Sequence, residues 1–200
     1  MASQMTNDAR AADEAYRILR STAKFAAGET PVRTVLIVDI DRAEPSGVAD
    51  QLAAAFARAG DRCVLVETDP RGGERREAGF SDLIHGSAQV AEVTRAGDVP
   101  GLARVGAGTA TAPDVLAGSG VATALGLLLA VHDHVILRSA PLPQNGDALA
   151  LAPNVDATIL VVTAGKSRRP RAIEARDALE RVGARLLGVV MVEGKRRLFW

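Results

Sequence analysis

Short apolar runs alternate with amphipathic segments along most of this 200-residue chain. The apolar runs predict strands at 34–38, 63–67, 102–105, 134–137, 157–163 and 186–192. Segments with apolar residues three and four positions apart predict helices at 12–27, 47–59, 80–84, 113–130 and 171–182. Strands that are apolar throughout and alternate with helices are typical of a parallel sheet covered on both faces. We therefore predict a three-layer α/β/α sandwich with a mostly parallel sheet.

The same pattern predicts one folded domain. Residues 1–11 precede the first amphipathic helix, and we expect them to be flexible. Residues 12–194 carry all the predicted strands and helices, and residues 195–200 form a tail that reads Lys-Arg-Arg-Leu-Phe-Trp. Basic residues beside aromatic ones suit a frayed end, a membrane surface or the groove of a partner.

Composition narrows the classes of function. The 24 Lys and Arg residues balance the 24 Asp and Glu residues, so no field that attracts nucleic acid is expected. A single cysteine, Cys63, excludes an internal disulfide and suits a reducing compartment. His85, His132 and His134 lack the spacing of metal ligands. No apolar run is long enough to span a bilayer, so we expect a cytoplasmic location, with any membrane contact made through a partner.

The segment between the first strand and the following helix is unusual for this architecture. Ligands of such folds bind beyond the carboxyl ends of the strands, which here are the segments 38–47, 67–73, 138–147 and 163–170. A loop that holds a triphosphate needs glycines that turn backbone N–H groups inward, a lysine for the phosphate oxygens and a hydroxyl for Mg²⁺. Residues 39–46 read Asp-Ile-Asp-Arg-Ala-Glu-Pro-Ser, without a glycine or a lysine.

Only the hydroxyl of a phosphate cradle remains in this segment. Ser46 supplies the hydroxyl, but we expect it to cap the next helix. Pro45 stands where the lysine would be and has no backbone N–H to donate. Asp39, Asp41 and Glu44 add negative charge that would repel phosphate.

Several motifs in the same order resemble the cytoplasmic domain of bacterial tyrosine autokinases that control capsule and exopolysaccharide export, which are relatives of the septum-site and chromosome-partitioning ATPases. Residues 14–20 (Glu-Ala-Tyr-Arg-Ile-Leu-Arg) match the family's E-x-x-R-x-x-R segment. Residues 64–71 (Val-Leu-Val-Glu-Thr-Asp-Pro-Arg) resemble its second acidic motif, and residues 133–141 align with its metal-binding strand. The resemblance covers about residues 14–192.

The resemblance implies a P-loop ATPase-like fold and ring assembly through Glu14, Arg17 and Arg20. It also implies a role in exopolysaccharide or capsule synthesis, at the inner face of the membrane. The partners it implies are further copies of the chain, a related kinase or a membrane chain-length regulator. From spacing alone, the three charged residues could equally form a solvated helix face.

The departures from the family pattern all concern catalysis. Arg138 stands where the metal-binding aspartate would be, and Glu67 replaces the first aspartate of the second acidic motif, with Asp69 retained. The tyrosine-rich tail is missing, and Tyr16 is the only tyrosine. We therefore expect neither a nucleotide cofactor nor a metal, and a non-catalytic regulatory or scaffold protein that is not an enzyme. Two alternatives stay open: an active ATP-dependent protein tyrosine kinase with an atypical site, and a partitioning-type ATPase switch.

Arg138 has two interpretations of its own. It could close its strand as a surface residue, or it could replace the lost cation. In the second case its guanidinium would bridge two of the carboxylates Asp39 or Asp41, Glu67 and Asp69, because this fold gathers the ends of their strands in one crevice.

Overall fold

The structure is a computed structural model that describes residues 2–25, 31–40, 46–69, 77–109, 114–142 and 145–193, with the side chains of the first helix described from Arg10 onward. Within these residues, one seven-stranded sheet has the order β3-β4-β2-β5-β1-β6-β7. Its strands are β1 (Thr34–Asp39), β2 (Cys63–Glu67), β3 (Thr94–Ala96), β4 (Leu102–Val105), β5 (His134–Arg138), β6 (Ala157–Ala164) and β7 (Leu186–Glu193). All neighbouring strands pair in parallel except β3, which is antiparallel to β4.

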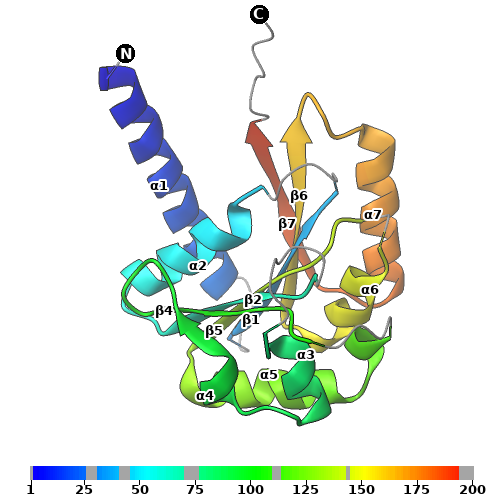
Figure 1. The fold of residues 1–200 in the computed structure, drawn as a ribbon. Coiled ribbons are helices and arrows are strands. Elements are labelled where there is room, and N and C mark those ends of the chain that lie inside the picture. The colour runs from blue at the N-terminus through cyan, green and yellow to red at the C-terminus, as the bar shows by residue number, and fades with distance from the viewer. Residues whose placement is uncertain are drawn as a thin grey trace, which may run out of the picture.

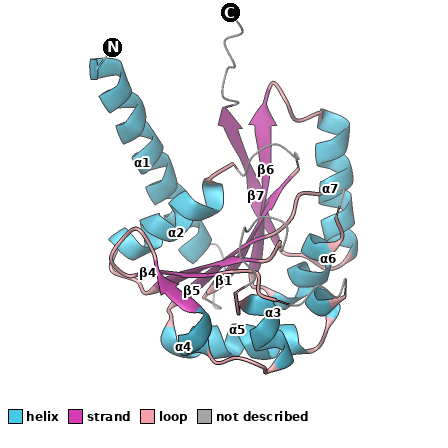
Figure 2. Ribbon diagram, viewed as in Figure 1, coloured by secondary structure: helices cyan, strands magenta, loops and turns pink. Residues whose placement is uncertain are grey.

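Helices lie on both sides of the twisted sheet, as Figures 1 and 2 show. They are α1 (Ala2–Phe25), α2 (Val48–Arg58), α3 (Phe80–His85), α4 (Val90–Val93), α5 (Gly120–Val131), α6 (Asp147–Leu151) and α7 (Arg169–Arg181), with the 3-10 turns η2 (Val115–Ala117) and η3 (Ala152–Asn154). This arrangement confirms the predicted fold class.

The core consists of two apolar layers, one on each face of the sheet. Alternate residues of the buried strands enter opposite layers, as the two-residue period of a strand requires. In β1, Leu36 packs with residues of α3, α5, α6 and α7, whereas Ile37 packs with the buried face of α2. Leu52 and Phe56 of α2 are fully buried in that second layer, where burial of such side chains stabilises the fold by about 1.5–3 kcal/mol each.

Several element boundaries differ from those predicted. The first helix begins at Ala2, about ten residues earlier than the predicted start at 12. The helix predicted at 113–130 is two elements, η2 and α5, because the backbone is extended at Gly118 between them. The sequence pattern missed α4, β3 and α6, which have three to five residues each and are too short to display a period.

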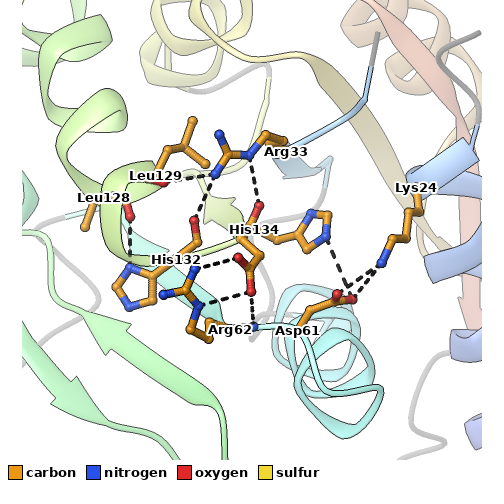
Figure 3. A network of polar contacts seen from close by, with 9 residues as sticks. Lys24, Arg33, Asp61, Arg62, Leu128, Leu129, His132 and His134 are labelled. Atoms are coloured by element: carbon orange, nitrogen blue, oxygen red, sulfur yellow. Dashed lines mark hydrogen bonds and ion pairs between the residues drawn. The ribbon is translucent and has the colours of Figure 1, made fainter. Parts of the chain in front are cut away.

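A network of polar contacts lies at the end of the sheet where the parallel strands begin (Figure 3). The Arg33 guanidinium donates to the carbonyl oxygens of Leu129 at 2.9 Å and His132 at 3.1 Å, and so satisfies the carboxyl end of α5. Asp133 accepts two bonds at 2.8 Å from Arg62, one from its backbone N–H and one from Nη2. These bonds lower the pKa of Asp133 below its ordinary value.

The same network fixes the carboxyl end of α1. Lys24 Nζ lies 3.0 and 3.1 Å from the two carboxylate oxygens of Asp61, and His134 Nε2 lies 3.8 Å from the same carboxylate. The His134 ring stacks on Phe56 with their centroids 4.1 Å apart. Burial lowers the pKa of His134, so this ring is held in its neutral form more strongly than a free imidazole would be.

Candidate functional site

The register of the sheet brings Glu67 and Arg138 together at its carboxyl edge, by which we mean the side of the sheet where the parallel strands end. Strands β2 and β5 are neighbours, and Glu67 is directly opposite Arg138 in their parallel pairing. On its other side β5 pairs with β1, where Ile37 is opposite Arg138. The last residues of these three strands therefore lie in the region where folds of this class bind their ligands.

The guanidinium of Arg138 bridges two carboxylates. Its Nε lies 2.6 Å from Glu67 Oε2, and Nη2 contacts the same carboxylate. Its Nη1 lies 2.7 Å from Oδ2 of Asp50, the third residue of α2. The side chains of Arg138, Glu67 and Asp50 are 22%, 21% and 27% exposed, so the pairs are largely screened from water. The predicted internal ion pair is confirmed for Glu67, whereas Asp50 was not among the four carboxylates proposed.

Two further residues extend this arrangement. Asp50 Oδ1 accepts a hydrogen bond of 2.9 Å from Nη1 of Arg104 in β4, whose Nη2 lies 3.0 Å from Oδ2 of Asp98. We call Glu67, Arg138, Asp50, Arg104 and Asp98 the carboxyl-edge cluster. Burial raises the pKa of Glu67, and the adjacent guanidinium of Arg138 opposes this rise. Alternating positive and negative groups let each buried charge face a partner of opposite sign.

The other residues that the sequence predicted for the site, where the structure describes them, make contacts outside the carboxyl-edge cluster or at its margin. Asp39 is buried at the end of β1, and its carbonyl oxygen accepts a 2.9 Å bond from Leu142 N–H. The Asp69 N–H donates to Glu67 Oε1 at 3.3 Å. Ser46 Oγ accepts a 3.3 Å bond from the N–H of Val48, the first residue of α2, although Gly47 occupies the capping position itself. Asp41, Glu44 and Pro45 lie outside the described residues.

The residues at this edge do not fit a resident Mg²⁺ ion. Such an ion prefers several oxygen ligands in an octahedron. Here the Glu67 and Asp50 oxygens face a guanidinium, which would repel a second cation at the same place. Among the described residues, no three His, Cys, Asp or Glu side chains lie together so that they could hold a metal ion.

The predicted assembly segment divides into two parts on α1. The exposed Glu14 and Arg17 form an ion pair of 2.9 Å, which at such exposure contributes about 0.2–0.5 kcal/mol. Arg20 is half-buried, and its Nε is covered without a hydrogen-bond partner within the described structure. Tyr16 and Leu19 pack against the core, while Ile18 and Phe25 are 60% and 76% exposed. The three charged residues therefore do not share one surface environment.

Sequence reasoning missed Asp50 and Arg104, although one signal pointed to Asp50. It is the only acidic residue in the first turn of α2. A helix that follows a strand in this fold begins at the carboxyl edge, so an acid in its first turn reaches the strand ends. Arg104 carries no comparable signal, because only the strand order places β4 beside β2.

Known proteins resemble the chain over most of its length, although no family model matches it. Tyrosine-protein kinase YwqD of Bacillus subtilis is 25% identical over 202 residues, which span 96% of this chain and 85% of that protein. Tyrosine-protein kinase CpsD of Streptococcus agalactiae is 21% identical over 193 residues, 92% of this chain and 84% of that protein.

Solved structures agree with this likeness. The BceF tyrosine kinase domain superposes with a TM-score of 0.79 at 25% identity and covers 92% of this chain and 78% of that chain. The septum site-determining protein MinD of Pyrococcus horikoshii, complexed with Mg-ADP, has a TM-score of 0.61 at 18% identity over 80% of this chain and 69% of that chain. The second likeness shows the fold alone.

These comparisons correct one expectation. The prediction that the chain is not an enzyme is contradicted, because its relatives are named tyrosine-protein kinases and are therefore enzymes. No helix within the described residues is long and apolar enough to cross a membrane. The chain is thus a homologue of the bacterial tyrosine-protein kinases, built on the P-loop fold that they share with MinD.

Proposed function

We propose that this chain acts in the synthesis or export of exopolysaccharide or capsule, and that it works by assembly through α1. Its partners in this proposal are further copies of the chain, a related tyrosine kinase or a membrane chain-length regulator. The proposal also places the chain at the inner face of the membrane, where such a regulator would hold it. The likeness to tyrosine-protein kinases over nearly the whole chain supports the cellular role.

The observation that carries the assembly proposal is the exposed length of α1. Figure 1 shows this helix beside α2 at its carboxyl end and projecting past the sheet at its amino end. Every residue from Arg10 to Ala15 is exposed, and Ile18 follows on the same helix with 60% exposure. Because most helical stability comes from packing of a helix face, a projecting segment of this kind gains stability when a partner packs against it.

The test compares the wild type with Arg17→Ala/Arg20→Ala by size-exclusion chromatography with light scattering. We expect the wild type to form oligomers at micromolar concentration and the variant to shift toward smaller species, because charged residues in an interface must find partners across it. Far-UV circular dichroism checks that α1 stays helical in the variant.

The matched control is Arg176→Ala/Arg181→Ala on α7, which also removes two positive charges. It should elute like the wild type. The α1 proposal fails if the wild type is monomeric and binds no related kinase, or if both double variants behave alike.

A second candidate function is ATP-dependent phosphorylation of protein tyrosine at an atypical site. The names of the relatives favour it. Tyr16, the sole tyrosine, is half-buried, and burial raises the pKa of its hydroxyl, so an exogenous tyrosine peptide is the better acceptor. Transfer of labelled phosphate from ATP to that peptide, with and without Mg²⁺, supports this function if it occurs and excludes it if it does not.

A further inference from the structure

The two edges of the sheet differ sharply in how they meet solvent. At one edge, β3 has three residues, Thr94–Ala96, and its middle residue is the exposed Arg95. At the other edge, β7 has eight residues, and the seven from Leu186 to Val192 are all apolar or glycine. Natural sheets protect exposed edges with short strands and charged residues, because unpaired N–H and C=O groups bind other strands. The β3 edge has this protection, and the β7 edge lacks it along most of its length.

The side chains of β7 also present apolar surface. Leu187, Val190 and Val192 pack against the core layer that contains α2. Val189 and Met191, two positions apart on the strand, are 59% and 71% exposed. Residues two apart share a face of a strand, so these two side chains form one apolar strip beside the open edge. A single exposed apolar residue is ordinary, but a strip along a strand that has no outer neighbour among the described residues is typical of an interface.

We propose that the β7 edge binds the β7 edge of a second copy of this chain, antiparallel and across a two-fold axis. The charges at the ends of the strand favour this occupant and this direction. Arg185 directly precedes β7 and Glu193 ends it, and both are exposed. Antiparallel pairing about the middle of the strand brings each Arg185 beside the Glu193 of the other copy, whereas parallel pairing would place like charges together.

Such a dimer closes on itself, because a two-fold interface uses the same surface of both copies. The backbone groups of the two β7 strands would pair and join the sheets into one. In this register Val189 of one copy would lie opposite Val189 of the other, and each Met191 would lie opposite Leu187. This interface is separate from α1, so the inference goes beyond the proposed function and can succeed or fail without it.

Sedimentation velocity in the Arg17→Ala/Arg20→Ala background tests the inference without assembly through α1. We expect a concentration-dependent dimer in this background. Arg185→Glu and Glu193→Arg should each weaken dimerisation at least about tenfold, because each reversal creates two like-charge contacts per dimer. The double variant Arg185→Glu/Glu193→Arg should restore dimerisation, since it exchanges the charges at both ends.

Two apolar-to-acid substitutions complete the test. Met191→Asp should abolish the dimer, whereas Ile173→Asp, at a residue of α7 that is 41% exposed, should leave it unchanged. A monomer at every concentration, whether residues 194–200 or another protein covers the edge, would overturn the inference. A dimer that the single charge reversals do not weaken would overturn it as well.

Discussion

Gly108→Ala is expected to lower the free energy of unfolding by about 3 kcal/mol or more, the largest effect of any single methyl group that we predict. Gly108 has φ of +100°, a backbone conformation that strains any residue with a Cβ. A Cβ at this position would also collide with the Ser81 hydroxyl and the Asp82 carboxylate. Neither atom can move away freely, because both residues are buried.

The loop after β4 depends on that carboxylate. Asp82 Oδ2 accepts hydrogen bonds from the Gly79 N–H at 2.8 Å and from the Thr109 N–H at 2.9 Å, while Oδ1 accepts one from the Thr109 hydroxyl at 2.5 Å. Burial raises the pKa of Asp82, but the hydrogen bonds from Thr109 and Gly79 outweigh it and bring the pKa below its ordinary value. A methyl group that displaces Asp82 would leave buried N–H groups without partners, at about 1–3 kcal/mol for each.

Urea denaturation of the wild type, Gly108→Ala and Gly106→Ala measures this effect. Gly106 is the matched control, because a Cβ there meets no atom within 4 Å and its φ is not positive. Gly106→Ala should change the free energy of unfolding by no more than about 0.5 kcal/mol. Equal stabilities for the two variants would show that the close approach at Gly108 does not constrain the fold.

Arg138→Ala is expected to lower the free energy of unfolding by about 2–4 kcal/mol. Loss of one partner of a fully buried ion pair costs about 3–5 kcal/mol, and an exposed pair is worth about 0–1 kcal/mol. The pairs of Arg138 lie between these limits but nearer the first, since the three side chains are 21–27% exposed. Without the guanidinium, Glu67 would lose its cationic partner, and Asp50 would keep only Arg104. Arg138→Asp should therefore be worse still.

Chemical denaturation of Arg138→Ala, Asp50→Ala and the double variant measures the interaction free energy between these two side chains, apart from their other contacts. The effects should be non-additive, because either single substitution already removes the contact between Arg138 and Asp50. Arg138→Lys should fall between the wild type and Arg138→Ala, since an ammonium cannot bridge two carboxylates as a planar guanidinium does. Arg176→Ala is the control, because its pair with Asp177 is 40–50% exposed and should matter little. Additive effects of the two single substitutions would contradict the bridge.

The sequence predicted the fold well because the decisive residues are buried on both sides of the sheet. Runs such as that of β1, whose six residues are all buried, can only be strands of a covered sheet. Short elements such as β3 and α6 escaped prediction, because their conformations depend on neighbours that are distant in the sequence. Apolar character alone does not give the buried face of α1, since Ile18 and Phe25 are 60% and 76% exposed.

The site was predictable where strand order alone determines proximity. Glu67 and Arg138 end neighbouring strands, so the family resemblance was sufficient to pair them. To predict Asp50, one would have to know which way the first turn of α2 faces. To predict Arg104, one would have to know the place of β4 in the sheet. The resulting cluster of five side chains adds ion pairs between β2, β4, β5 and α2.

We expect the Arg138 guanidinium to take the place of a metal ion at the carboxyl edge, since it faces the oxygens of Glu67 and Asp50. Thermal unfolding of the wild-type protein with ATP, in millimolar Mg²⁺ and in EDTA, tests it most directly. A ligand that binds the folded state raises the free energy of unfolding by RT ln(1 + [L]/Kd), so a metal-bound nucleotide would raise Tm. We expect the same Tm in Mg²⁺ and in EDTA. A higher Tm that requires Mg²⁺ would contradict this expectation and would favour an atypical nucleotide site.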